Sequence, residues 1–140
     1  MAAPTRGHAG TWGEDAAAGW YQAAGFVLVD RNWQCPLGEV DLVVHRHATP
    51  TSSAVLAFVE VKARSSTRFG SPADALTPAK QRRVRRAAAA WLATHTRTGG
   101  WGDLRFDLAS VTRQRPAPGT GTAAPTSNPP PVVDVIEHAF

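Results

Sequence analysis

Charged residues interrupt two strongly apolar segments, and this pattern restricts the fold more than any other feature of the chain. Residues 55–64 read VLAFVEVKAR and residues 38–46 read GEVDLVVHR, and both are rich in the β-branched side chains typical of strands. The first of these segments begins apolar on both faces, which predicts a central strand of a sheet. A buried carboxylate is costly unless it is neutralised or finds a partner. The carboxylates in these strands therefore need a structural or a functional partner.

Side chains alternate between the two faces of a strand, so the sequence predicts on which face each of these charged residues lies. Glu60 and Lys62 are two residues apart, so both side chains are expected on one face of their strand. The same period predicts that Glu39 and Asp41 share a face of the neighbouring strand. The apolar residues that alternate with them, which are Val40, Leu42 and Val44, are expected on the opposite face.

Two interpretations of this charge pattern are open. The first is a salt bridge between Lys62 and either Glu60 or Asp41. The second is a site for a divalent cation such as Mg²⁺, which takes oxygen ligands from one or two carboxylates and keeps waters for a substrate phosphate. The order of Asp41 and then Glu60-x-Lys62 resembles that of the Asp-(x)n-Glu-x-Lys nucleases. The combined pattern on adjacent strands favours the cation site.

Two helices are expected beside the sheet. The T-x-x-E pattern from Thr11 to Glu14 is typical of a capping box and predicts a helix that ends at Gly25. Thr77 and Pro78 are typical of the N-cap and first position of a second helix. That helix carries apolar residues at helical spacing on one face: Val84, Ala87, Ala88, Trp91 and Leu92.

Further strands are expected at residues 26–33, at 104–112 and in the final segment VVDVIEHAF. The order of elements, α-β-β-β-α-β-β, predicts one α/β domain over residues 1–140, with a mixed central β-sheet flanked by helices. Neither G-x-G-x-x-G nor G-K-[ST] occurs, so the phosphate loops of nucleotide-binding folds are not expected. Residues 113–131 are rich in Pro, Gly, Thr and Ala and predict a flexible insert.

The composition of the chain indicates which kind of partner and which cellular compartment to expect. The net charge of +4 and the pI of about 10.2 favour an acidic partner such as nucleic acid. Cys35 is the only cysteine, so no intrachain disulfide can form and a reducing compartment is expected. The first ten residues lack the apolar run of a signal peptide, and no segment has the length of a membrane span. We expect a cytoplasmic protein with no membrane segment.

The acidic segments also resemble those of a known family. GEVDLVV (38–44), FVEVKAR (58–64) and RFDLASV (105–111) are similar to the signature blocks of the YraN-like family of small bacterial proteins. The resemblance covers residues 10–112 and the last few residues. The matches outside these blocks are Gly10, Gly13, Glu14, Ala17, Tyr21, Gly25, Asn32, Gly70, Lys80 and the terminal Ala-Phe. The resemblance implies a restriction-endonuclease-like fold of the PD-(D/E)xK superfamily, similar to archaeal Holliday-junction resolvases.

The same resemblance implies cleavage of DNA phosphodiester bonds with Mg²⁺ or Mn²⁺ as cofactor. Asp41 and Glu60 would ligate the metal, while Lys62 would activate the attacking water and stabilise the developing charge. Glu14 would add an acidic group near the metal, as in resolvases, but the capping box accounts for this residue equally well. The chain departs from the superfamily pattern at Val40, which stands where the PD motif has proline.

Basic residues close to these blocks are candidates for contacts with nucleic-acid phosphates. The candidates are Arg64 and Arg68 after the Glu-x-Lys block, and Lys80, Arg82 and Arg83 on the polar face of the second helix. For the helix, a solvated surface is the alternative interpretation.

Other polar residues have structural interpretations. Arg105 and Asp107 are expected to form an ion pair at the edge of the fourth strand. His45 and His47 are expected to be exposed, because neither a cysteine nor an acidic residue lies at zinc-ligand spacing from them.

Two functions from different classes follow from the sequence. One is a metal-dependent DNA endonuclease, with branched DNA as a candidate substrate and a homodimer as a candidate assembly. The other is a non-catalytic nucleic-acid-binding or assembly protein that retains the nuclease fold. The presence of Asp41, Glu60 and Lys62 together favours the enzyme.

Overall fold

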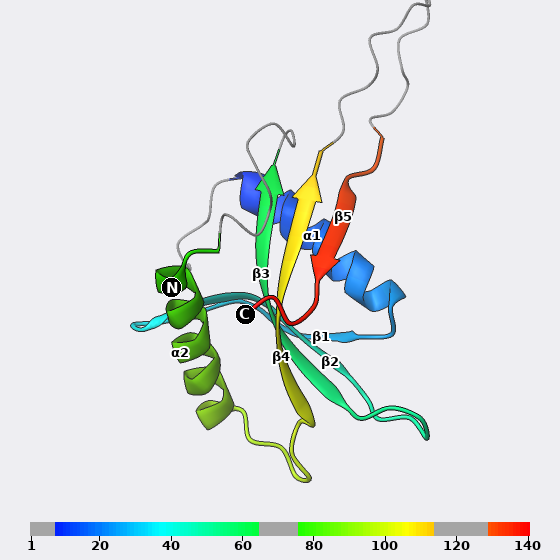
Figure 1. The fold of residues 1–140 in the computed structure, drawn as a ribbon, viewed down its shortest axis with the longest axis vertical. Helices are drawn as coiled ribbons and strands as arrows, with labels where there is room; N and C mark the ends of the chain where they lie inside the picture. The colour runs from blue at the N-terminus through cyan, green and yellow to red at the C-terminus, as the bar shows by residue number, and fades with distance from the viewer. Residues whose placement is uncertain (1–7, 65–75, 114–128) are drawn as a thin grey trace, which may run out of the picture.

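A five-stranded mixed sheet forms the centre of the molecule (Figure 1). The structure is a computed structural model that describes residues 8–64, 76–113 and 129–140. The strands run in the order β1-β2-β3-β4-β5, and only β3 and β4 pair in parallel among these described strands. Their bounds are Val27–Cys35 (β1), Gly38–Arg46 (β2), Val55–Arg64 (β3), Asp103–Thr112 (β4) and Val132–Ile136 (β5). The predicted α/β fold with a mixed sheet and flanking helices is confirmed.

Helices α1 (His8–Ala23) and α2 (Pro78–Thr94) pack against opposite faces of the sheet and build two separate apolar cores. On the α1 face, Ala17 and Tyr21 pack in a cluster with Val59 of β3. On the α2 face, Ala88 and Trp91 pack in a cluster with Phe58. β3 therefore contributes buried side chains to both cores, as its apolar start predicted.

The first turn of α2 is the one predicted from the sequence. Thr77 is the N-cap, and its Oγ1 accepts a hydrogen bond from the Lys80 amide at 3.2 Å, with Pro78 at the start of the helix. The predicted apolar face is also confirmed. Its four buried members are Val84, Ala87, Ala88 and Trp91, and Leu92 packs at the border of the same cluster.

The start of α1 differs from the prediction. The helix already includes His8, the first residue that the structure describes, so Thr11 lies inside it and the predicted N-cap at Thr11 is wrong. Glu14 is a residue of the helix body, and its carboxylate accepts hydrogen bonds from β1. The helix ends at the predicted place, because Gly25 adopts φ 91° and the Phe26 amide donates to the Tyr21 carbonyl at 2.9 Å.

The alternation of side chains along β2 breaks at Asp41. Val40 belongs to the α2 cluster, whereas Leu42 and Val44 belong to the α1 cluster. The prediction that these three residues share a face is therefore wrong. The break lies opposite Asn32 of β1, which adopts φ 52°, a conformation that asparagine tolerates better than most residues.

The two strands of the β1–β2 hairpin bend together at this point. Arg31 pairs with Leu42 and Trp33 with Val40, so the bend lies between these two pairs. The ladder between β2 and β3 runs from Arg46 to Leu42 and does not continue to Asp41. The hairpin thus leaves the sheet here and curves toward α2 (Figure 1).

Two further predictions about polar residues need correction. His45 is buried, at 4% exposed, because β2 lies between two other strands, and its Nε2 is 3.0 Å from the Trp101 carbonyl oxygen. His47 is exposed, as predicted. Arg105 and Asp107 do form the predicted ion pair, but it is buried rather than at an edge, since β4 lies between β3 and β5.

Two more expectations concern membranes and the insert. None of the helices among the described residues has the length and apolar character needed to cross a membrane. The predicted flexible insert falls largely on residues 114–128, which lie outside the described residues.

Candidate active site

Asp41 is fully buried and is held by the backbone of β3. Its Oδ2 accepts a hydrogen bond from the Val61 amide at 2.8 Å, and the residue is 0% exposed. The reason lies in the strand pairing, which ends at Leu42 and Val59. Beyond that pair β2 no longer offers a carbonyl to Val61, and the Asp41 carboxylate accepts its hydrogen bond instead. Asp41 is therefore fixed against the peptide that follows Glu60.

Glu60 and Lys62 share the α2 face of β3, as predicted. They alternate with Val61, which packs against the α1 cluster, and they continue the row of Phe58, which packs in the α2 cluster. Both residues are half-buried, and Glu60 Oε1 lies 3.6 Å from Lys80 Nζ of α2. The structure thus brings Asp41 next to the Glu-x-Lys segment at the point where β2 and β3 part.

Glu14 reaches the same bend from the α1 side. It is 2% exposed, and its Oε2 accepts hydrogen bonds from Asn32 Nδ2 at 2.9 Å and from Arg31 Nε at 3.4 Å. Asn32 occupies the bend of β1 that faces Asp41 across the hairpin. The neighbouring Gly13 makes this approach possible, because a Cβ there would lie 2.7 Å from Ala63 Cβ of β3.

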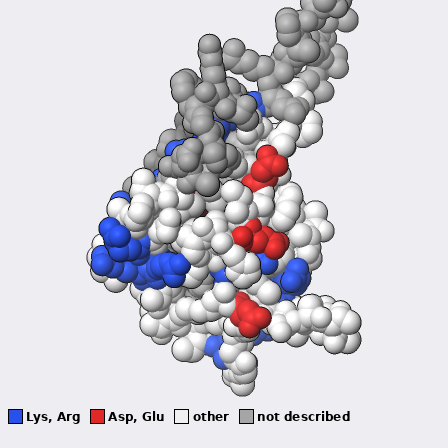
Figure 2. All heavy atoms as spheres, in the orientation of Figure 1, with Lys and Arg blue, Asp and Glu red and all other residues white. Residues whose placement is uncertain are grey.

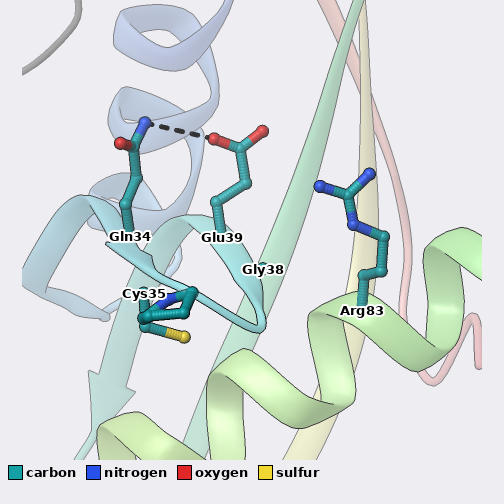
Figure 3. Close-up of a pocket in the computed structure, with 6 residues that line it drawn as sticks. Gln34, Cys35, Gly38, Glu39 and Arg83 are labelled. Atoms are coloured by element: carbon teal, nitrogen blue, oxygen red, sulfur yellow. Dashed lines mark hydrogen bonds between the residues drawn. The ribbon is translucent and has the colours of Figure 1, made fainter.

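Two hollows adjoin the site on the α2 side, and the sequence did not indicate them. The smaller hollow is lined by Glu39, Glu60, Lys80, Arg83 and Val84. The larger, of about 250 Å³, lies between the β1–β2 turn and α2 and shares Glu39 and Arg83 with the smaller one (Figure 3). Figure 3 shows Glu39 on the hairpin and Arg83 on the helix at opposite sides of the larger hollow.

The hairpin approaches α2 closely at Gly38. A Cβ added there would lie 2.5 Å from the Arg83 carbonyl oxygen, so only glycine allows this contact without a shift of backbone. Glu39, the next residue, accepts a hydrogen bond from Gln34 Nε2 at 3.3 Å. The turn is thereby held beside the helix that carries the candidate phosphate-binding residues.

The basic residues named as candidates fall into three groups. Lys80 and Arg83 line the hollow that includes Glu60, and Arg82 is exposed on the same helix. Arg64 is half-buried at the end of β3, and Arg68 lies outside the described residues. Figure 2 shows the largest group of basic side chains on this face over α2, with smaller basic patches elsewhere, while the visible carboxylates lie on the side of β4 and β5.

The acidic residues fit an open divalent-cation site. Among residues 8–64, 76–113 and 129–140, no three His, Cys, Asp or Glu side chains converge to enclose a metal ion. Mg²⁺ does not need such a cage, since it commonly uses one or two carboxylates and leaves its other positions to water and substrate phosphate. Asp41, which is buried, and Glu60, which lines a hollow together with Glu39, Lys80 and Arg83, supply hard oxygen donors of that kind.

The fold and this site together indicate a class of protein. A mixed sheet flanked by helices, with an Asp and a Glu-x-Lys segment on neighbouring strands, is consistent with a restriction-endonuclease-like α/β protein. The chain belongs to the family described as Uncharacterised protein family UPF0102, whose model matches residues 13–111. This confirms the predicted YraN-like family. Glu14, Asp41, Glu60 and Lys62 all lie within the matched segment.

Relatives in this family cover most of the chain. A UPF0102 protein of Beutenbergia cavernae is 45% identical over 106 residues, which span 76% of this chain and 83% of the relative. A UPF0102 protein of Frankia casuarinae is 44% identical over 109 residues, spanning 78% and 86%. One of Nocardia farcinica is 46% identical over 102 residues, spanning 73% and 74%.

Proposed function

We propose that this protein is a metal-dependent DNA endonuclease with its centre at Asp41, Glu60 and Lys62. The observation that carries the proposal is the hydrogen bond that fixes Asp41 on the Val61 amide. Val61 is the residue between Glu60 and Lys62, so this bond holds Asp41 beside both of them. The ladder between β2 and β3 ends at that point, and Glu60, which lies just beyond its end, lines a hollow. A structural salt bridge would not require the ladder to end there.

In the proposed reaction, Asp41 and Glu60 would hold Mg²⁺ or Mn²⁺. When bound, the cation supplies Lewis-acid activation of the phosphodiester. Lys62 orients the attacking water and stabilises the negative charge that develops on the phosphate. Glu14, fixed by Asn32 and Arg31, adds negative charge on the α1 side of the same bend. The Val61 amide preorganises Asp41, which is what a site built on rigid strands requires.

The DNA partner is proposed from the distribution of basic side chains. Lys80 and Arg83 lie beside Glu60, Arg82 is on the outer surface of α2, and Arg64 ends the strand that carries Lys62. Such residues neutralise backbone phosphates without regard to base sequence. Branched DNA as a substrate, homodimeric assembly and a cytoplasmic location stay predictions of the sequence.

A cleavage assay with a matched carboxylate control tests the proposal. Supercoiled plasmid, linear duplex and four-way junction DNA are incubated with Mg²⁺ or Mn²⁺ and either wild type, Asp41→Asn or Asp103→Asn. Asp103 is an exposed carboxylate at the start of β4, so its substitution controls for the loss of one negative charge. We expect wild type and Asp103→Asn to cleave at least one substrate and Asp41→Asn to cleave none.

Two results would count against the proposal. Equal cleavage by wild type and Asp41→Asn would remove Asp41 from the reaction. DNA binding by the wild type with no cleavage under any of these conditions would favour the non-catalytic binding protein instead.

A further inference from the structure

An ion pair joins α2 to the centre of the candidate site. Lys80 Nζ lies 3.6 Å from Glu60 Oε1, with the lysine side chain 45% exposed and the glutamate side chain 14% exposed. The two side chains thus differ in how freely they can move. Glu60 is confined on a central strand, whereas Lys80 can reach solvent from the same position.

The backbone of Lys80 is fixed even though its side chain is half exposed. Its amide donates to Thr77 Oγ1 at 3.2 Å, which caps the helix, and Gln81 Nε2 donates to the Leu76 carbonyl at 3.0 Å. Leu76 is itself buried. The first turn of α2 is therefore anchored, and any movement of the ammonium must come from the flexible four-carbon stem of the lysine.

Two positive groups compete for Glu60 under the proposed function. A divalent cation at Asp41 and Glu60 needs the Glu60 carboxylate, whose Oε1 now faces the lysine ammonium, and the two positive charges repel each other. We infer that Lys80 is an exchange residue, which pairs with Glu60 in the metal-free protein and transfers to a DNA phosphate when a divalent cation binds. This inference rests on the proposed function.

The surroundings of Lys80 provide a place for the displaced ammonium. Lys80 and Arg83 are three residues apart on α2, so they lie on one side of the helix, and both line the hollow that contains Glu60. A phosphate bound at the mouth of this hollow would meet two cations from a fixed helix. Transfer of Lys80 would then require no movement of the backbone.

The exchange has a thermodynamic consequence. DNA that accepts Lys80 removes one positive group that competes with the cation for Glu60, and the cation in turn makes Lys80 available to DNA. Cation binding and DNA binding must therefore strengthen each other by the same factor, because coupling between two ligands is reciprocal. Substitution of Lys80 should therefore remove the contribution of this exchange to cation binding and to DNA binding.

Binding of Ca²⁺ as a hard-cation probe tests the inference without relying on turnover. Its affinity is measured by calorimetry with and without a short DNA duplex, for wild type, Lys80→Met and Arg82→Met, with gels to confirm that the duplex stays intact. Arg82→Met is the matched control, because Arg82 is an exposed cation on the same helix. Thermal melting of each variant checks that all three are folded.

We expect Lys80→Met to bind Ca²⁺ without DNA up to about fivefold more tightly than wild type, the range for a partly exposed ion pair. The enhancement of Ca²⁺ binding by DNA should fall by a similar factor in this variant. Arg82→Met should weaken DNA binding but keep the wild-type Ca²⁺ affinity in the absence of DNA.

Two contrary results can be told apart. Asp41→Asn is measured in the same way as the other variants. If wild type binds Ca²⁺ and Asp41→Asn does not, but Lys80→Met has wild-type or weaker Ca²⁺ affinity without DNA, the exchange is refuted while the proposed metal site stands. If wild type and Asp41→Asn bind Ca²⁺ equally or not at all, the metal site fails and the exchange fails with it.

Discussion

Asp107 and Asp41 are both fully buried carboxylates on neighbouring parts of one sheet, yet they are held in different ways. Asp107 accepts hydrogen bonds from Arg105 Nε at 2.9 Å and from the Tyr21 hydroxyl at 2.7 Å. Both of these partners are themselves buried. Asp41 accepts from a backbone amide, at the place where two strands separate beside a hollow. Equal burial therefore does not imply an equal role.

The Asp107 network has the properties of a structural ion pair. Burial and the adjacent Asp107 charge raise the pKa of the Tyr21 hydroxyl well above its ordinary value, so it stays a hydrogen-bond donor. Burial is the largest single effect on Arg105 and opposes its charge, but the hydrogen bond to Asp107 and the negative charges of Asp107 and Glu137 together raise the pKa of the guanidinium. The His138 amide also donates to Asp107 at 3.3 Å, which ties the segment after β5 to the core. This network joins α1, β4 and the C-terminal segment.

The largest expected effect on stability is that of Asp107→Asn. The change leaves the Arg105 guanidinium buried without a full counter-charge, and we expect a loss of about 3–5 kcal/mol in the free energy of unfolding. Asp41→Asn should cost less than half of this, because an amide oxygen can still accept from the Val61 amide. Urea unfolding of both variants at pH 7 measures the difference. Equal losses would mean that Asp41 is as structural as Asp107.

A smaller effect is expected from Gly38→Ala, which tests how the hairpin is held beside α2. A Cβ at this position meets the Arg83 carbonyl oxygen, so we expect a loss of about 1–3 kcal/mol from overpacking. Gly19→Ala is the control, since nothing lies within 4 Å of a Cβ there and alanine favours a helix. Thermal unfolding compares the two. A Gly38→Ala protein as stable as wild type would show that the hairpin can move away from α2.

The smallest expected effect on stability concerns His45, a buried polar residue with a structural role. Burial lowers the pKa of His45, so the fold favours the neutral ring. Protonation then favours the unfolded chain, and the contribution of His45 to stability is present above about pH 6.5 and is lost as the pH falls below it. The slope from one such group cannot exceed about 1.4 kcal/mol per pH unit.

Substitution separates His45 from its neighbour. His45→Gln should reduce the fall in stability between pH 7 and pH 5, as measured by urea unfolding. His47→Gln should keep most of that fall, because His47 is exposed. The opposite pattern would mean that His45 is not the buried group that titrates.

Most of the fold could be predicted where local pattern and tertiary packing agree. Thr77 and Pro78 specify the start of α2 by local hydrogen bonding and fixed backbone angles, and the apolar spacing of the helix matches its buried face. The central position of β3 followed from its apolar start. Glu60 and Lys62 were placed on one face correctly because β3 is regular through this segment.

The parts that could not be predicted depend on irregular backbone. The period of two fails in β2 opposite Asn32, which takes a positive φ in the partner strand, and no local pattern in β2 shows this. The same bend places Asp41 on the Val61 amide and Glu14 beside Asn32. The hollow between Glu60 and α2 depends on how the helix docks, which pairs residues far apart in sequence.

The central claim is that Lys62 acts in a reaction and not in a salt bridge that stabilises the fold. The direct test measures cleavage, Ca²⁺ binding and urea unfolding on the same Lys62→Ala protein. We predict that cleavage falls by orders of magnitude, while Ca²⁺ affinity and the free energy of unfolding stay close to those of wild type, because the lysine acts in the transition state. A loss of about 3–5 kcal/mol in stability, as for a broken buried ion pair, with cleavage per folded molecule unchanged, would contradict the account.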